Sequence, residues 1–243
     1  MIIYEANYVQ AVNIDNAWRE ALCLCAKNGF DYKVRNSSKT DIGGSYIDQY
    51  RKQLPYVSIR ITQPWLRPLA PILPPSVPPP TTDEKIEKYF AQYLAEDVVA
   101  ENEDYTYGGY IKGQIPKTIE RLNNSKGNTN QACIAVCDTQ SVFLEDPPCL
   151  RSISFKNVNN KLNMTVFFRS WDLFVGLPEN LGGLQMLKEL VLSELDFDIE
   201  DGDLIANSDG LHLYDQYWDV VNTLNVSDDE KIVFKRNEEG AIV

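Results

Sequence analysis

The residues best suited to chemistry lie in two short segments in the second half of the chain. The first reads Asp146-Pro147-Pro148-Cys149-Leu150, and the second, twenty residues after the cysteine, reads Arg169-Ser170-Trp171-Asp172. Two prolines fix two successive φ angles, so the backbone itself specifies where the Cys149 thiol lies. A thiol is a nucleophile, and the planar fork of a guanidinium suits phosphate. The two segments therefore indicate an enzyme that modifies a nucleotide through a covalent step.

A third segment, His212-Leu213-Tyr214, contains the only histidine of the protein. Its two polar residues are two positions apart, so on a strand or extended loop their side chains point the same way. We expect both to belong to the same site. The alternatives are that His212 is a structural histidine and that Cys149 is an inert buried thiol.

The overall charge narrows the class of partner. The chain has 243 residues and a formal net charge of −12. A protein that grips a polynucleotide needs a basic face, whereas a mononucleotide needs only a local group of arginines. We therefore expect a mononucleotide and no polymeric nucleic acid. No apolar run approaches the length of a membrane span, so no membrane partner is expected.

The cysteines and the N-terminal residues predict a cytoplasmic protein. Five cysteines is an odd number without framework spacing, and the first residues lack the basic and hydrophobic segments of a secretory signal. Cys23 and Cys25, and likewise Cys133 and Cys137, lie in apolar stretches with no histidine nearby. We interpret both pairs as small core residues, and no metal site is expected.

The first half predicts two helices separated by a proline-rich segment. Trp18, Ala21, Leu22 and Cys25 share one helical face, which Asp15 and Asn16 cap and Gly29 ends. Residues 56–61 are β-branched and alternate. Residues 64–80 hold eight of the thirteen prolines, which predicts an extended surface loop within a single domain spanning 1–243, although a linker is the alternative.

The rest of the chain predicts helices and strands without βα alternation. A capping box at residues 81–84 begins one helix, and Pro116 begins another over about 115–122. Residues 152–155 and 162–168 alternate as strands and are joined by a hairpin at 157–160. A helix follows Pro178, and residues 213–224 are interpreted as one more. The fold class is therefore α+β.

At this point the chain resembles the folate-dependent thymidylate synthase family. The likeness spans about residues 105–225, and it depends on the order and spacing of several pieces together. It implies a thymidylate synthase-like fold, a mixed sheet with flanking helices, in a homodimer that packs through a sheet. The pieces are Tyr107-Gly108, Pro147-Pro148-Cys149, Arg169-Ser170-Trp171-Asp172, Gly176-Leu177-Pro178-Glu179-Asn180, Gly202-Asp203 and His212-Leu213-Tyr214.

The resemblance implies a specific reaction. Cys149 attacks a pyrimidine ring, and the neighbouring carbon captures a one-carbon unit, so that dUMP becomes dTMP with methylene-tetrahydrofolate or a related reduced pterin. Positive charge must favour the thiolate, and Arg169 would supply it. The same pieces also suit a pyrimidine-nucleotide hydroxymethylase, or a relative that binds a nucleotide or a protein partner without turnover.

The resemblance also implies roles for the other residues. Arg169 and Ser170 would bind the phosphate, and His212 and Tyr214 would touch the sugar hydroxyl. On the base side, three more residues are involved. Tyr107 would organise the ring and its waters, Asp172 would support the ring and the folate, and Asn180 would face the base. An amide there suits uracil and a carboxylate suits cytosine, unless Asn180 is only a helix cap.

Two expected features of the family are missing. Members usually carry a pair of arginines upstream of the cysteine, where this chain reads Thr129-Asn130-Gln131-Ala132. We expect the phosphate to use Arg169 with Lys126, or Arg35 with Lys39. The general-acid/base glutamate is not located, since the sequence does not discriminate among three candidates, Glu87, Glu96 and Glu101.

Overall fold

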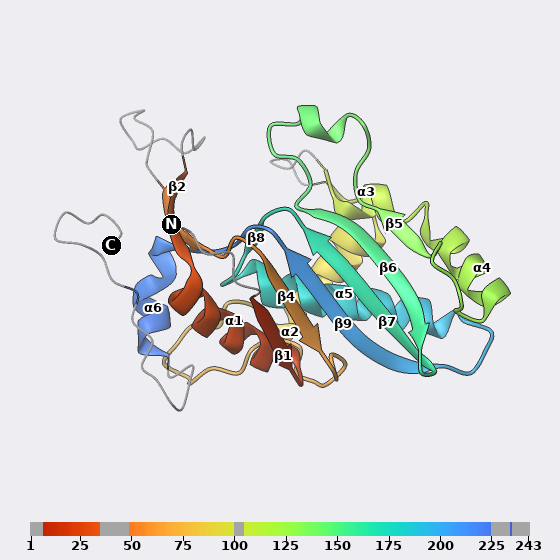
Figure 1. Cartoon of the computed structure of the whole chain (residues 1–243), viewed down its shortest axis with the longest axis horizontal. Helices are drawn as coiled ribbons and strands as arrows, with labels where there is room; N and C mark the ends of the chain where they lie inside the picture. Colours follow the sequence, from red (N-terminus) through yellow and green to blue (C-terminus); the bar gives the residue numbers. More distant parts are fainter. Residues whose placement is uncertain (1–6, 35–48, 100–104, 225–233, 235–243) are drawn as a thin grey trace.

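The computed structural model describes residues 7–34, 49–99, 105–224 and 234. Within these residues the strands form a six-stranded sheet, ordered β1-β4-β9-β7-β6-β5, and a four-stranded sheet, ordered β2-β3-β10-β8 (Figure 1). Both sheets contain parallel and antiparallel pairs, and helices pack against them. The mixed α+β class predicted from the sequence is confirmed. The strands are β1 Tyr8–Ala11, β2 Phe30–Val34, β3 Gln49–Gln53, β4 Val57–Ile61, β5 Cys133–Ala135, β6 Leu150–Val158, β7 Lys161–Phe168, β8 Trp171–Asp172, β9 Glu200–Ser208 and β10 Leu211–Tyr214.

The helices are spread along the chain, from α1 near the N-terminus to α6 after the last strand. The longest are α1 and α5, which contact each other and cover one face of the large sheet (Figure 1). None of the helices that the structure describes is both long and apolar enough to cross a membrane. The α-helices are α1 Ile14–Asn28, α2 Asp83–Tyr89, α3 Tyr107–Ile111, α4 Ile115–Ser125, α5 Gly176–Ser193 and α6 Trp218–Thr223. The irregular helices are η1 Phe90–Ala95, η2 Ser141–Phe143 and η3 Asp215–Tyr217.

The core lies between the large sheet and these helices. Every second residue of β4 and β7, including Ile59 and Val166, is buried, as the alternating pattern predicted. The same alternation shows that the interpretation of Cys133, on the edge strand β5, as a core residue was wrong. Ile134 points into the core from β5, so its neighbour Cys133 points out and is exposed, while Cys25 on α1 is fully buried.

Helix α1 has the predicted apolar face but a different cap. The backbone N–H of Asn16 donates to Oδ1 of Asn13 at 2.9 Å, so Asn13 is the N-cap and the prediction of Asp15 and Asn16 was wrong. The cap must be the residue before the first helical turn, and that turn begins at Ile14. Gly29 ends the helix as predicted.

Residues 64–80 contain no helix or strand, and two helices bind them. Asp15, freed from capping, accepts a hydrogen bond from the N–H of Ile72 at 3.1 Å. Asp83, in the first turn of α2, accepts from the N–H of Ala70 at 2.8 Å. Because both carboxylates lie in first turns, they also complement the positive ends of their helices.

The hairpin between β6 and β7 has the predicted position. Val158 pairs with Lys161, and the two residues between them, Asn159 and Asn160, have φ values of 55° and 60°. Two positive φ angles in succession are required by the turn that matches the strand twist, and asparagine tolerates them. The local sequence thus sets the register of the strands that follow Cys149 and precede Arg169.

The segment around residue 213 differs from its prediction. Residues 211–214 form strand β10 between β3 and β8, and the helix α6 begins only at Trp218. A run of apolar residues fits either structure, and here Leu211 and Leu213 are buried on a strand. The sequence did not predict the strands β1, β2, β3, β8 and β9.

Close packing joins α2 and α5. A Cβ atom on Gly182 would meet Ile86, and one on Gly183 would meet the ring of Tyr89. Beyond Tyr89 the helix widens into the π-helix η1, a feature that is frequent at functional sites. The widened turn places Tyr93 against Tyr89, with stacked rings whose centroids are 5.5 Å apart.

Candidate active site

Arg169 binds the backbone of residues 146–149, which we call the Cys149 loop. Its Nε donates to the carbonyl of Pro148 at 3.2 Å, and its Nη2 donates to the carbonyl of Pro147 and to Oδ1 of Asp146. The N–H of Arg169 also donates to the carbonyl of Cys149 at 2.9 Å. The two segments predicted from the sequence therefore lie together, and the guanidinium fixes the loop that carries the thiol.

The Cys149 thiol is half-buried, and opposing effects act on its pKa. Burial raises that pKa above its ordinary value, and the positive charge of Arg169 is the largest opposing effect. Asp146 raises the pKa, whereas Arg151 and Arg51 lower it. The free protein therefore carries Cys149 as the thiol at neutral pH, beside several guanidinium groups.

Tyr107 contacts the chain directly after the cysteine. The N–H of Leu150 donates to its hydroxyl oxygen at 3.2 Å. Burial raises the pKa of Tyr107 well above its ordinary value, so the hydroxyl keeps its proton. Since that oxygen accepts from Leu150, its O–H remains able to donate to a bound molecule.

Asn180 lies inside helix α5, in its second turn, and is not the cap that the alternative interpretation required. The indole Nε1 of Trp171 donates to its Oδ1 at 2.9 Å. An indole N–H only donates, so this bond fixes which end of the amide is oxygen and leaves Nδ2 as the presented donor. Tyr89 is a partly buried neighbour of Asn180, and burial of its hydroxyl raises its pKa, so the hydroxyl stays protonated.

Asp172 and Ser170 flank the same turn. The two oxygens of Asp172 accept from the N–H groups of Phe174 at 3.0 Å and Gly176 at 3.3 Å, where α5 begins. Burial raises the pKa of Asp172, and these backbone donors oppose that effect. Ser170 is half-buried in the bend between β7 and β8, directly after Arg169.

His212 is buried and its tautomer follows from its partners. Its Nδ1 lies 2.8 Å from the carbonyl oxygen of Gly210, and its Nε2 lies 3.3 Å from Nη1 of Arg51. A carbonyl only accepts and a guanidinium only donates, so the proton is on Nδ1 and Nε2 accepts. Burial, with the charge of Arg51, lowers the pKa of His212 to about 4, so the ring is neutral.

Arg51 is the main site residue that sequence reasoning missed. It pairs with Tyr214 on β10 and with Tyr32 on β2, and residues directly opposite in antiparallel strands share a face. We call these three residues the Arg51 row. The Arg51 guanidinium lies 4.7 Å from the Tyr32 ring centroid and hydrogen-bonds Tyr214. The polar sequence of β3 carries no strand pattern, so only pairing with β10 reveals it.

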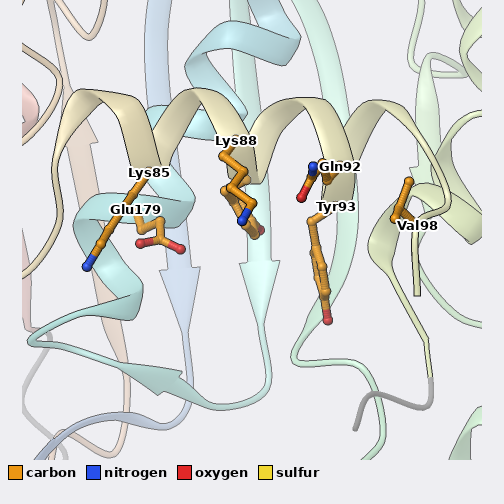
Figure 2. A pocket seen from close by; sticks show the side chains of 7 residues that line it. Lys85, Lys88, Gln92, Tyr93, Val98 and Glu179 are labelled. Atoms are coloured by element: carbon orange, nitrogen blue, oxygen red, sulfur yellow. The ribbon is translucent and has the colours of Figure 1, made fainter. Parts of the chain in front are cut away.

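A cavity of about 340 Å³ opens near Tyr107 and Asn180, between α2, η1 and the start of α5. Figure 2 shows Lys85, Lys88 and Tyr93 projecting from the same side of the helical segment, with Glu179 beside Lys85. The Tyr93 ring contacts the Tyr107 ring edge-on at 5.0 Å, which connects the cavity to the residues around Cys149. The lining residues are Lys85, Lys88, Tyr89, Gln92, Tyr93, Val98 and Glu179.

Lys126 does not reach the site within this chain. Its Nζ binds Asp196 at 2.8 Å, and its carbonyl binds Asn157 near the far end of β6. Asn157 lies eight positions along the chain from Cys149, which at about 3.3 Å per residue is roughly 26 Å. The prediction for Lys126 was therefore wrong within one chain. Arg35 and Lys39 lie outside the described residues.

The two described glutamate candidates, Glu87 and Glu96, do not line this cavity either. Glu87 is exposed and lines a different cavity beside Arg67, and Glu96 forms an exposed ion pair with Lys112. Glu101 lies outside the described residues. The carboxylate that does line the cavity is Glu179, which accepts a hydrogen bond from the Thr81 hydroxyl at 2.8 Å.

Comparison with known proteins agrees with this arrangement. Residues 10–233 match the family model described as thymidylate synthase. A protein of Methanosarcina mazei named "Putative thymidylate synthase" is 25% identical over 224 residues, which cover 89% of this chain and 93% of the relative. One of the same name from Methanothermobacter marburgensis is 31% identical over 140 residues, covering 54% of this chain and 60% of the relative.

A solved structure gives the fold. Thermostable thymidylate synthase A from Bacillus subtilis superposes with a TM-score of 0.64 at 16% sequence identity, covering 86% of this chain and 82% of that one. The predicted fold is thereby confirmed. Because the family match extends over nearly the whole chain, from residue 10 to residue 233, the protein belongs to the thymidylate synthase family.

Proposed function

We propose that this protein is a methyltransferase that converts dUMP to dTMP with methylene-tetrahydrofolate or a related reduced pterin. The observation that carries the proposal is the position of the Cys149 thiol. It lies beside Tyr107 on a loop fixed by Arg169. Burial raises the pKa of the thiol, and the charges of Arg169, Arg151 and Arg51 oppose that effect. A half-buried thiol beside guanidinium groups is suited to attack an electron-poor ring.

Two residues are suited to the base. After Cys149 adds to the pyrimidine ring, negative charge develops on a ring carbonyl, and the neighbouring carbon becomes the nucleophile. The Nδ2 of Asn180 and the hydroxyl of Tyr107 are the donors we assign to the base and its waters, because Trp171 and Leu150 already occupy their oxygens. An amide donor favours a uracil carbonyl, so we propose dUMP over dCMP.

The residues that we assign to the sugar and the phosphate lie on β10 and in the turn between β7 and β8. We assign the sugar hydroxyl to His212 and Tyr214, which extend from β10 toward Arg51. Ser170 and Arg169 are assigned to the phosphate. Two of the three guanidinium nitrogens of Arg169 bind the Cys149 loop, and its Nη1 is the nitrogen we assign to the ligand.

The cavity beside α2 fits a reduced pterin. Tyr93 offers a ring face, and Lys85 and Lys88 suit an acidic substituent at the cavity mouth. The bound cofactor would supply both the one-carbon unit and the hydride. Tyr89 and Tyr93 would orient it, and Asp172, at the start of α5, would hold the turn that separates it from the base.

We further propose a homodimer. Helices α1 and α5 cover one face of the large sheet, and we assign the dimer contact to the opposite face. Sedimentation of the purified protein tests this assignment directly. A protein that is monomeric at micromolar concentration would contradict the homodimer and leave the proposed reaction unaffected.

The reaction is tested with dUMP tritiated at the ring carbon that receives the one-carbon unit. Methylation releases tritium to water and forms dTMP, and a tetrahydrofolate cofactor leaves as dihydrofolate. A hydroxymethyl nucleotide would replace the proposal with hydroxymethylation, and absence of tritium release would leave a binding protein. Cys149→Ser is the control, and a variant that kept full turnover would contradict the covalent step.

A further inference from the structure

The hydroxyl of Tyr89 is buried and makes no hydrogen bond with any residue that the structure describes. Tyr89 is the last residue of α2, and its ring lies so close to α5 that Gly183 has no room for a Cβ atom. The residue also lines the cavity of the candidate active site. Because nearly all buried polar groups in proteins have a partner, this hydroxyl is expected to have a role in the site.

Two observations place the hydroxyl beside the amide of Asn180. Asn180 and Gly183 are three residues apart on α5, so they share one face of the helix, and the Tyr89 ring covers that face. The Asn180 amide also opposes the rise that burial causes in the pKa of Tyr89, as a neighbouring N–H donor does. Since Trp171 already holds Oδ1 of the amide at 2.9 Å, the end of the amide that faces Tyr89 is Nδ2.

We propose that Tyr89 is a positioning residue for recognition of the base: its hydroxyl oxygen accepts one Nδ2 hydrogen of Asn180 and so directs the other at a carbonyl of the pyrimidine. The inference rests on the proposed function, because it takes Asn180 to face the base of a pyrimidine nucleotide. Trp171 on β8 holds the oxygen end of the amide, and Tyr89 on α2 holds the nitrogen end. The donor that selects a uracil carbonyl is thus oriented from two separate elements.

A neutral hydroxyl is suited to this position. Burial holds the pKa of Tyr89 well above its ordinary value, so the group is a phenol at neutral pH. A hydroxyl can accept from Nδ2 and still donate its own hydrogen, and the carboxylate of Glu179, which lines the same cavity, is an acceptor whose charge acts on Tyr89. Hydrogen bonds in a chain strengthen one another, so this second bond would make the Tyr89 oxygen a better acceptor.

The ring of Tyr89 has a packing role that its hydroxyl does not share. The ring stacks on that of Tyr93, with centroids 5.5 Å apart, and fits against Gly183. Phenylalanine keeps both contacts because it lacks only the oxygen. Tyr89→Phe therefore removes the proposed role without the cavity that Tyr89→Ala would leave in the packing of α2 on α5.

The test is a double-mutant cycle in which calorimetry measures the dissociation constants of dUMP and dCMP. The proteins are the wild type, Tyr89→Phe, Asn180→Ala and the double variant. We expect Tyr89→Phe to reduce the preference for dUMP over dCMP about 3- to 10-fold, the effect of one neutral hydrogen bond. In the Asn180→Ala background the same substitution should change neither constant, because Tyr89 acts only through the amide.

The matched control is Tyr110→Phe. It also removes one hydroxyl from a tyrosine, but this hydroxyl accepts a hydrogen bond from Ser141 and lies on α3. We expect this variant to keep the wild-type preference for dUMP over dCMP. A loss equal to that in Tyr89→Phe would mean that the preference responds to general loosening of the packed tyrosines, and the inference would be wrong.

Turnover gives a second readout. After Cys149 adds to the ring, negative charge develops on the carbonyl, so a donor aimed at it contributes more to the transition state than to binding. Tyr89→Phe should therefore lower kcat for dUMP by about 10-fold and leave the KM for the reduced pterin within about twofold, since the ring that lines the cavity remains. A residue that only shaped the cavity would raise that KM instead.

The outcomes separate the inference from the proposed function. If Tyr89→Phe keeps the wild-type preference, or lowers it equally with and without the Asn180 side chain, Tyr89 does not position the amide, and methylation of dUMP stands. If the cycle behaves as expected but dUMP releases no tritium, Tyr89 keeps its role in base recognition and the proposed reaction is wrong. A wild type that binds dUMP and dCMP equally would contradict both the inference and the assignment of Asn180 to the base.

Discussion

Burial raises the pKa of Cys149, and Arg169 and Arg51 both oppose that rise, but the surroundings of the two arginines differ. Arg169 binds two carbonyls of the Cys149 loop and the carboxylate of Asp146. Arg51 touches two tyrosines and a neutral histidine, and its Nε has no partner. The first arginine is largely committed to positioning the thiol, whereas the second keeps its charge for something that binds. The two arginines near the thiol therefore have different roles.

The largest effect is expected from Arg169→Ala. It removes two bonds to the loop carbonyls and the strongest influence that lowers the pKa of Cys149. With each charge-assisted bond at about 1.5–3 kcal/mol, we expect dTMP formation to fall by about 100-fold or more. The pH profile of Cys149 alkylation, followed by mass spectrometry of its peptide, should move to higher pH. An unmoved profile would show that Arg169 does not lower the pKa of the thiol.

A smaller effect, on stability, is expected from His212, which contacts Arg51. Burial lowers the pKa of His212 to about 4, against an ordinary value of 6.5. Below pH 6.5 the unfolded chain binds a proton that the folded protein refuses. Stability is therefore full above pH 6.5 and declines toward pH 4, by about 3 kcal/mol at 1.36 kcal/mol per unit. Denaturant unfolding of the wild type and His212→Asn, compared at each pH, measures it. Equal slopes in both proteins would refute the prediction.

Asn180→Asp tests the base side of the group. Because the Trp171 indole holds Oδ1, the amide presents Nδ2, and a carboxylate would present an acceptor instead. We expect the ratio of tritium release from dUMP and dCMP to shift toward dCMP by about 10-fold or more. Trp171→Phe is the companion variant: it frees the amide to rotate and should reduce discrimination without reversing it. An unchanged ratio in Asn180→Asp would mean that the side chain does not face the base.

The smallest effect concerns Asp146, whose side chain is 82% exposed. Its charge raises the pKa of Cys149, so Asp146→Asn should lower that pKa and speed alkylation at pH 7. An exposed charge contributes little, and we expect at most about a fivefold change that added salt abolishes. Glu145→Gln, the adjacent exposed acid, is the control and should leave the rate unaltered. Slower alkylation in Asp146→Asn would mean that Asp146 acts mainly by holding Arg169.

Much of the fold near Cys149 was predictable because its signals are local. The prolines before the thiol, the asparagines of the β6–β7 turn and the apolar face of α1 each act within a few residues. Patterns of this kind encode φ angles and periodicity. Both can be recognised in a segment without knowing which other segment packs against it. The cap of α1 was misplaced because Asp15 and Asn13 are both suitable residues, and the choice depends on where the first turn begins.

What the sequence determined by itself is the spacing of Cys149, Arg169 and Asn180 around a hairpin and a helix start. Only the tertiary structure decided that Arg51 and His212 lie near the Cys149 thiol. Arg51 and His212 are 161 residues apart, and they meet because β3 pairs with β10 in one particular register. A polar strand carries no periodic signal, and register between distant strands depends on burial in the assembled sheet, which no short segment contains.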